Sequence, residues 1–186
     1  MRKNLGAKPY VYPMPVFVIA TYDENGIPNA MNAAWGCVAD YKKIAIIMDA
    51  NHKTYKNIVK NQAFTVSMCD IKNMVYADYV GIVSGNDTAN KLEKTPWNLV
   101  KSAFVNAPII EEFPLCLECK FESFDEDKEL LIGEIVNVSC DETILNDKGI
   151  IDPSLLKPIT YDPVNHAYYV LGEKVGNAFS DGKKIK

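Results

Sequence analysis

Two cysteines stand three positions apart in the sequence CLEC, at Cys116 and Cys119. This spacing occurs in redox dithiols and in half-sites for metal ions, and both uses require the two sulfurs to converge. Apolar and polar residues alternate through 115–121, which indicates a strand, where residues three apart face opposite sides. We therefore expect structural cysteines. His52 and His166 have no second ligand nearby in the sequence, so we expect no metal site.

The segment 49–61, DANHKTYKNIVKN, places His52, Lys53 and Thr54 where a helix is predicted to begin. Unpaired backbone N–H groups and the helix dipole attract anions at such a position. A capped helix with a solvated first turn explains the same residues and, for this segment alone, is the simpler interpretation.

A second polar segment, VSGNDTANK, covers residues 83–91. Ser84 and Gly85 can present a hydroxyl group and bare backbone N–H groups to a ligand, and Lys91 can supply charge to a phosphate. A surface loop that ends in a lysine is the alternative. The sequence has neither G-x-G-x-x-G nor G-x-x-x-x-G-K-[ST], so another device would have to bind a phosphate.

Residues 31–40, MNAAWGCVAD, combine strand-like character with two alanines and a glycine around Trp35. Small residues weaken side-chain packing in a strand and often mark a place where something approaches the backbone closely. The approaching group is either another segment of the protein or a ligand.

These residues must be positioned by a chain that is mostly strand-like. The predicted strands are 16–21, 34–39, 43–48, 64–68, 115–124, 130–140 and 168–171. The Asn25-Gly26 turn predicts a hairpin between the first two strands, and DEDKE predicts another between 115–124 and 130–140. Helical spacing predicts one helix over 54–62, capped by Thr54 or Asn51, and a second over 73–82 that stops near Gly81.

Helices interrupt the strands without alternating with them, which opposes a doubly wound parallel sheet. The order favours a mainly β fold, an antiparallel β-barrel with peripheral helices. We expect residues 1–186 to form a single domain, with 141–186 as a C-terminal segment that wraps across the barrel or a partner subunit.

Composition narrows the function further. A net charge of −4 and a pI near 5.2 argue against a nucleic-acid or anionic-lipid surface. No apolar run approaches the roughly 18 residues that cross a bilayer. The five cysteines are an odd set scattered through apolar segments, which is typical of free thiols in a reducing compartment. We expect a cytoplasmic protein that does not act at a membrane.

Taken in order, the polar segments and their flanks resemble the flavoredoxin and flavin reductase-like family over nearly the whole chain. The motifs that carry the resemblance are P-x-P-V (Pro13 to Val16), the Asn25-Gly26 turn, N-A-A-W (Asn32 to Trp35), H-K-T-Y (His52 to Tyr55), S-G-N-D…N-K (Ser84 to Lys91) and H-A-Y-Y-V-L-G (His166 to Gly172). The resemblance implies a Greek-key-like split β-barrel that binds FMN, usually as a homodimer with the flavin near the subunit interface.

The resemblance also assigns site residues. It places Asn32 to Trp35 beside the isoalloxazine ring, with Ala33 and Ala34 leaving room for backbone hydrogen bonds. Strand alternation would turn the Trp35 ring toward the barrel or the dimer interface, so that only its backbone meets the cofactor. The residues implied at the ribityl phosphate end are His52, Lys53, Thr54, Tyr55, Ser84, Gly85 and Lys91.

His52 departs from the family, whose members commonly have arginine there, and a neutral imidazole carries less charge than a guanidinium group. FMN carries the redox chemistry, so we expect no catalytic side chain. The resemblance implies an oxidoreductase that transfers electrons between FMN and NADH, NADPH or a redox protein partner. The alternative is a non-enzymatic FMN-binding electron carrier, or a flavin storage or interaction module.

Overall fold

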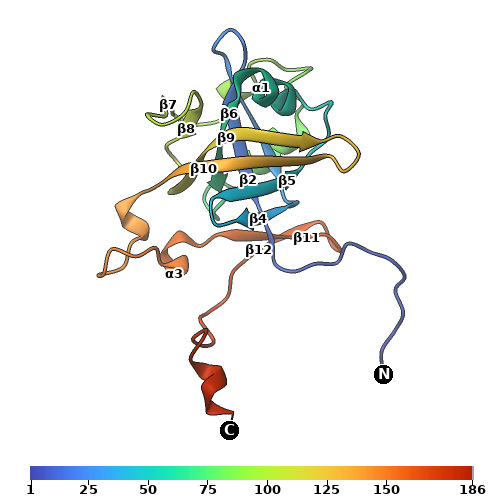
Figure 1. Cartoon of the computed structure of the whole chain (residues 1–186), viewed down its shortest axis with the longest axis vertical. Coiled ribbons are helices and arrows are strands. Elements are labelled where there is room, and N and C mark those ends of the chain that lie inside the picture. Colours follow the sequence, from blue (N-terminus) through green and yellow to red (C-terminus); the bar gives the residue numbers. More distant parts are fainter. Residues whose placement is uncertain (186) are drawn as a thin grey trace.

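The computed structural model describes residues 1–185, and its body is built on one antiparallel sheet of seven strands (Figure 1). In sheet order the strands are β3 (Pro28–Ala33), β2 (Phe17–Tyr22), β6 (Ala63–Met68), β9 (Leu115–Asp125), β10 (Leu130–Cys140), β5 (Lys43–Ile47) and β4 (Gly36–Asp40). The predicted mainly β class is therefore confirmed.

The connection between β3 and β4 shows that this sheet curls into a split barrel. These strands lie at opposite ends of the sheet order, yet Ala34 and Trp35 alone separate them in sequence. A chain advances at most about 3.6 Å per residue, so the two edges must lie close together. The Trp35 carbonyl oxygen accepts a hydrogen bond of 2.8 Å from the Ile47 N–H, which extends the β4–β5 ladder up to the break.

Smaller elements surround the barrel. A three-stranded sheet contains β1 (Met14–Pro15), β11 (Ile159–Asp162) and β12 (Ala167–Val170), and a two-stranded sheet contains β7 (Leu99–Lys101) and β8 (Pro108–Ile110). The helices are α1 (Lys53–Asn61), α2 (Met74–Ile82) and α3 (Pro153–Leu156), with 3₁₀ turns η1 (Lys91–Lys94), η2 (Glu142–Ile144) and η3 (Asp181–Lys184). No helix within residues 1–185 is long and apolar enough to span a membrane.

The first predicted hairpin has a different second strand. The Asn25-Gly26 turn joins β2 to β3, whereas β4 pairs with β5. β3 has the sequence PNAMNA, which contains a proline, two asparagines and no β-branched residue, so its composition did not predict a strand. It forms at the sheet edge, where proline is tolerated. The predicted hairpin of β9 and β10 is confirmed.

Both predicted helices are present, but the predicted N-cap of α1 is wrong. His52 occupies the cap position and makes no side-chain cap hydrogen bond, because Thr54 lies inside the first turn. The side chain of Asn51 instead donates a hydrogen bond of 2.9 Å to Asp49 Oδ1. α2 ends at Ile82, one residue beyond the predicted stop at Gly81.

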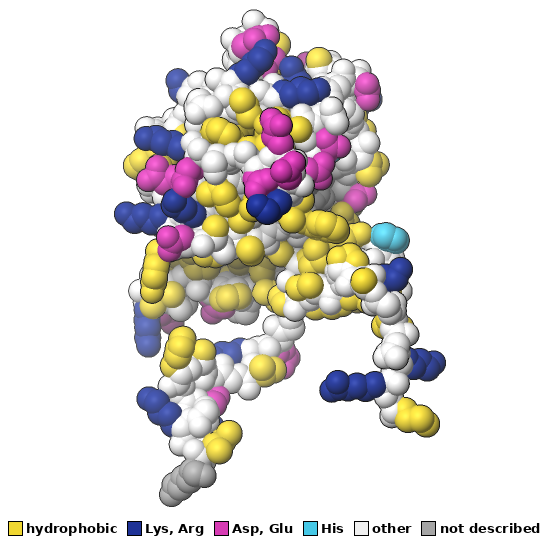
Figure 2. Space-filling model, turned by 45° about the vertical axis from the view of Figure 1, so that its right-hand side comes forward, with side chains coloured by type: hydrophobic (Ala, Val, Ile, Leu, Met, Phe, Trp, Pro, Cys, Tyr) yellow, Lys and Arg dark blue, Asp and Glu magenta, His cyan; other side chains and the backbone are white. Residues whose placement is uncertain are grey.

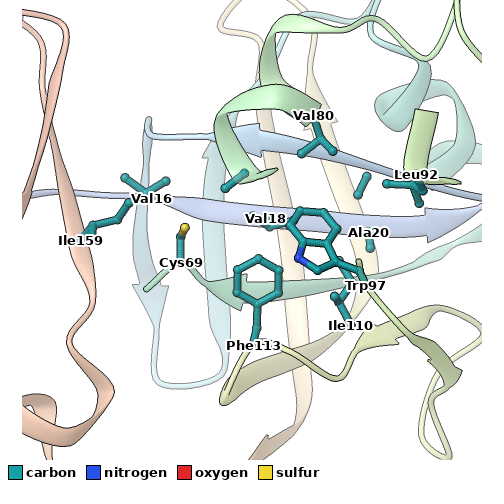
Figure 3. Close-up of a cluster of buried hydrophobic side chains, with 12 residues drawn as sticks. Val16, Val18, Ala20, Cys69, Val80, Leu92, Trp97, Ile110, Phe113 and Ile159 are labelled. Carbon is teal, nitrogen blue, oxygen red and sulfur yellow. The ribbon is translucent and has the colours of Figure 1, made fainter. Parts of the chain in front are cut away.

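β2 divides the core into two clusters because its side chains alternate between its two faces. Val16, Val18 and Ala20 belong to a cluster that includes Val80 of α2 and the ring of Trp97, shown in Figure 3. Phe17 and Ile19 belong to the second cluster. Its other buried members are Ile44, Ile46, Met48, Ile58, Phe64, Val66, Cys119 and Leu131. β2 is therefore buried on both faces, which anchors the edge strand β3 beside it.

Gly133 of β10 allows the close packing of the second cluster. A Cβ atom added there would lie 2.3 Å from Phe64 Cζ and 3.3 Å from the Lys120 carbonyl oxygen. Gly133→Ala is therefore expected to lower the free energy of unfolding by about 1–3 kcal/mol, the usual cost of overpacking. Gly172→Ala is the matched control, since no described atom lies within 4 Å of its added Cβ. Denaturant unfolding of both variants checks this, and equal midpoints would contradict it.

Candidate functional site

A cleft of about 180 Å³ lies among the end of β3, the start of α1 and the segment that follows α2. We call it the polar cleft. It brings together most of the residues predicted at the phosphate end. Those that line it are His52, Lys53, Thr54, Ser84, Gly85 and Lys91. Asn32, which was predicted at the ring, also lines it, with Met31 and residues 80–83. No acidic residue is among its lining residues, so the side chains that carry or can acquire charge there are all cationic.

The first turn of α1 forms one wall of the polar cleft. No side chain caps this nine-residue helix and no acidic residue lies in its first turn, so its N-terminal dipole is uncompensated. His52 and Lys53 stand at this end and add side chains that favour anions. The helix start can therefore contribute backbone N–H donors and positive potential to a bound anion.

Thr54 is fixed in the cleft wall by β3. Its hydroxyl oxygen accepts a hydrogen bond of 2.7 Å from Asn29 Nδ2, and the threonine is 2% exposed. Because the oxygen accepts from Asn29, the hydroxyl hydrogen remains available for an acceptor in the cleft. Sequence reasoning missed Asn29, which follows a proline in a segment that was not predicted to be a strand.

Gly85 is required by close packing. A Cβ atom there would lie 2.4 Å from Asn29 Oδ1 and 3.3 Å from Lys53 Cβ. The buried Asn29 Oδ1 and Asn57 Nδ2 have no hydrogen-bond partner within the described residues. Asn29, Asn57, Lys53 and Gly85 also line a second polar hollow of about 230 Å³, which shares Lys53 and Gly85 with the polar cleft. Unpaired polar groups thus border the site, as expected where polar ligands bind.

Lys91 reaches the cleft from η1 and also completes α2. Its ammonium group donates hydrogen bonds of 2.7 Å to the Val80 carbonyl oxygen and 2.6 Å to that of Val83. Two donated hydrogen bonds leave the third N–H group free. Burial lowers the pKa of Lys91 to about 8. The predicted cation is present, but it is held by backbone carbonyls and is not a freely moving surface lysine.

Asn32 is positioned by α2 and by β12. Gly81 allows the helix to approach, since a Cβ there would lie 3.0 Å from Asn32 Cβ. Asn32 Nδ2 donates to the Tyr168 hydroxyl oxygen at 3.4 Å, and the Tyr168 hydroxyl donates to Asp78 Oδ1 at 2.8 Å. Burial, together with this hydrogen bond to Asp78, raises the pKa of Tyr168 to about 12. Sequence reasoning missed the Tyr168–Asp78 pair, because its members are 90 positions apart.

A second cleft begins at Ala34, two residues beyond Asn32. It has a volume of about 420 Å³ and a largely apolar lining, and we call it the apolar cleft. Residues 34–37 of the break and of β4 form one wall, and Pro13, Met14 and Pro15 form another. Trp35 lies in this cleft and is 46% exposed, so its ring is not packed inside the barrel. Of the two predicted locations of this ring, the barrel is wrong, because residues 34–35 interrupt the strand alternation, and the dimer interface stays a prediction.

Two of the predicted site residues have side chains that pack elsewhere. The Tyr55 ring contacts the Phe124 ring at a tilt of 46°, with ring centroids 4.2 Å apart, and Ala33 packs with it against the second core cluster. Neither lines the polar cleft or the apolar cleft. Tyr55 therefore supports the site through α1, and any contact from Ala33 to a ligand would come from its backbone.

The CLEC motif does not have the properties of a redox dithiol. Cys116 and Cys119 are both buried on β9, and Cys119 belongs to the second core cluster. Burial raises the pKa of Cys116 to about 11 and raises that of Cys119 further. Both thiols therefore stay protonated at neutral pH, which disfavours nucleophilic and metal-binding roles. All five cysteines are free.

The fold and the site together define a split-barrel protein with a cationic cleft at a helix start. Comparisons with known proteins identify its family. The family model described as "Flavin reductase like domain" matches residues 10–164. The solved flavoredoxin of Desulfovibrio vulgaris (Miyazaki F) is 36% identical, with a TM-score of 0.93 over 98% of this chain and 100% of that chain. The chain belongs to the flavoredoxin and flavin reductase-like family, as its motifs predicted.

More distant relatives share the fold. Flavoredoxin from Methanosarcina acetivorans is 23% identical, with a TM-score of 0.90 and full coverage of both chains. An FMN-binding domain of a flavin reductases-like enzyme from Shewanella baltica OS155 is 24% identical, with a TM-score of 0.79 and 88% coverage of each chain. The predicted antiparallel split barrel is thereby confirmed.

Proposed function

We propose that this protein is an FMN-binding oxidoreductase that transfers electrons between bound FMN and NADH, NADPH or a redox protein. The observation that carries the proposal is the arrangement of two clefts of opposite character, which Asn32 and Ala34 link at the end of β3. FMN has the same division, with an anionic phosphate at one end and a largely apolar ring system at the other. Membership of the family supports the same assignment.

The residues of the polar cleft fit a phosphate group. The uncapped start of α1, the Thr54 hydroxyl, Ser84 and the third Lys91 N–H supply donors from three separate elements. Gly85 keeps the wall free of a side chain at the point where Asn29 lies directly behind it. Hydrogen bonds from charged groups to a phosphate are among the stronger contacts in proteins. We assign His52, Lys53, Thr54, Ser84, Gly85 and Lys91 to this end.

At the other end, Asn32 and the backbone of Ala33 to Trp35 would meet the ring. β3 is an edge strand, so one side of its backbone is not paired to another strand. The small side chains of Ala33 and Ala34 leave this backbone accessible to a planar ligand. Donors held there by the barrel would stabilise negative charge without rearranging, which favours the reduced form of a ring system.

Bound FMN would supply the redox chemistry itself. The protein binds, orients and tunes it, so we assign no acid, base or nucleophile among the side chains. The Tyr168 hydroxyl beside Asn32 stays protonated, because its raised pKa keeps it a hydrogen-bond donor through neutral pH. We therefore assign Tyr168 and Asp78 to holding Asn32 in place.

The identity of the electron donor distinguishes a flavin-dependent enzyme from a non-enzymatic electron carrier. FMN-loaded protein is mixed anaerobically with NADH or NADPH, and the visible flavin absorbance is followed. Rapid bleaching by a pyridine nucleotide is the result expected of a reductase. Bleaching that occurs only after a reduced redox protein is added would identify the non-enzymatic carrier instead.

The pKa of Lys91 gives the phosphate site a pH dependence. Its ammonium group carries its charge below about pH 8 and loses it above, because burial lowers its pKa from the ordinary value of 10.5. The FMN phosphate is mostly dianionic above about pH 6. The ratio of FMN to riboflavin affinity is therefore expected to be highest between about pH 6 and 8 and to fall above pH 8. Fluorescence titration of both ligands from about pH 6 to 9.5 checks this, and a ratio that is constant above pH 8 would contradict it.

We also propose that the protein acts as a homodimer. Trp35 and Ile47 both line the apolar cleft, and their side chains are 46% and 41% exposed. Contiguous exposed apolar surface of this kind is typical of an interface. Sedimentation of the purified protein tests the assembly.

A further inference from the structure

Residues 171–185 extend away from the body of the protein, and we call them the C-terminal arm (Figure 1). Val175 and Phe179 are fully exposed, at 101% and 97%, and Ile185 is 86% exposed. Leu171 is the last residue whose backbone is tied to the body, through its N–H and the Pro158 carbonyl oxygen at 3.2 Å. The arm therefore presents large apolar side chains that no other described residue of the chain covers.

The arm nevertheless has a defined local structure. The Asn177 N–H donates to Asp181 Oδ2 at 2.8 Å, and the Asp181 N–H donates back to the Asn177 carbonyl oxygen at 3.1 Å. Lys184 forms an ion pair of 2.8 Å with Asp181, and η3 follows this turn. Gly176 lies against this turn, since a Cβ there would be 2.8 Å from Asp181 Oδ2. Phe179 is therefore displayed next to a turn with its own hydrogen bonds and ion pair.

The apolar cleft is the complementary surface. It lies beside the wall of Pro13, Met14 and Pro15, and Leu171 lines a smaller hollow on that same proline-rich segment. Cleft and arm are thus at one end of the body, where Figure 2 shows hydrophobic side chains gathered above the two terminal segments. The arm extends away from the body of its own chain (Figure 1). In a twofold dimer, however, each arm can reach the other copy's cleft reciprocally.

We propose that the C-terminal arm of one copy lies over the apolar cleft of a second copy, with Phe179 packed against the wall that contains Trp35 and Cys37. The arm then supplies a wall that each copy lacks alone. This inference rests on the proposed function for one point only, namely that the cleft which the arm closes holds the ring end of FMN. The exchange of arms itself is independent of FMN.

Cys37 gives the proposal a direct test, because it is exposed and lines the apolar cleft. The test variant is Phe179→Cys with Cys140→Ser, which leaves Cys37 as the other exposed thiol, since the remaining three cysteines are buried. Mild oxidation is expected to give a covalent dimer on non-reducing gels. Adding Cys37→Ser should abolish that dimer if the introduced thiol bridges to Cys37. A bridge between two introduced thiols, one on each arm, would persist.

Three results would overturn the proposal. One is an intrachain bridge, which would place the arm on its own cleft. Another is a covalent dimer that persists with Cys37→Ser, and the third is no bridge at all. Since Phe179→Cys removes the ring, the dimer is also measured by sedimentation with Phe179→Ala. Loss of a central aromatic contact is expected to raise the dimer dissociation constant about tenfold or more.

Val75→Ala is the matched control for sedimentation, because Val75 is an exposed apolar residue of α2 away from both clefts. It should leave the dimer dissociation constant unchanged. An equal shift for Phe179→Ala and Val75→Ala contradicts the arm exchange. FMN titration of the same samples tests the two proposals separately. Bridged dimers that bind no FMN would refute the proposed FMN-binding function and support the exchange of arms. Protein that binds FMN but forms no bridge would support the function and refute the exchange of arms.

Discussion

Thr54→Ala is expected to weaken FMN binding about tenfold or more while leaving riboflavin binding nearly unchanged. The Thr54 hydroxyl accepts a hydrogen bond from Asn29 and keeps its own hydrogen for the polar cleft. A hydrogen bond to a charged group contributes about 1.5–3 kcal/mol, and 1.4 kcal/mol corresponds to a factor of ten in affinity. Riboflavin has the same ring and ribityl chain but no phosphate, so it isolates this contribution.

The riboflavin measurement also separates binding from folding. Thr54→Ala leaves Asn29 Nδ2 without its partner, which lowers the stability of the cleft wall for both ligands alike. A loss confined to FMN therefore reports the phosphate contact. Lys56→Ala is the matched control, because Lys56 is an exposed cation of α1 that does not line the polar cleft. Equal losses of FMN and riboflavin affinity in Thr54→Ala would refute the assignment.

Lys91→Met is expected to damage both the fold and the site. The methionine keeps the apolar stem but removes the donors to the Val80 and Val83 carbonyl oxygens at the end of α2. The variant loses two charge-assisted hydrogen bonds, which destabilises the fold. It also removes the cost of burying the ammonium charge, the same burial that lowers the lysine pKa, and this offsets part of the loss. We expect a net loss of about 2–4 kcal/mol in the free energy of unfolding.

The same variant is expected to weaken FMN about tenfold relative to riboflavin, through loss of the cation. Lys94→Met is its matched control, since Lys94 is an exposed lysine in the same 3₁₀ turn. Denaturant unfolding measures the first effect and fluorescence titration the second. An unfolding midpoint equal to that of Lys94→Met would show that the two carbonyl contacts contribute nothing.

The barrel strands were predictable where apolar strand-forming residues dominate their sequences. β2, β6 and β5 are rich in Val, Ile and Phe, and their patterns place them within one or two residues. β3 was not predictable, because PNAMNA gains its strand conformation from pairing with β2 and from packing against α2. β11 has only four residues, ITYD, and was also missed; it pairs with the neighbouring β12 and with β1, which is about 145 positions away. Such long-range pairing leaves no local pattern.

The candidate site likewise has a part that the sequence predicted and a part that it did not. Most polar residues of the polar cleft were predicted through the order of their motifs, while the local sequence alone favoured a solvated helix start and a surface loop. The structure adds the contacts that no local pattern encodes: Asn29 behind Thr54 and Gly85, Lys91 under the end of α2, and Tyr168 beside Asn32. The barrel alternative for the Trp35 ring was wrong because strand alternation was extended across the break between β3 and β4.

The central claim is that the two clefts together bind one FMN molecule per chain. The most direct measurement is the visible absorbance spectrum of the purified protein, followed by titration of FMN into flavin-free protein with fluorescence as the signal. We predict a flavin absorbance band, or its appearance on loading, and quenching that saturates at one FMN per chain with higher affinity than riboflavin. A protein that stays colourless and neither quenches nor is thermally stabilised by FMN would contradict the account.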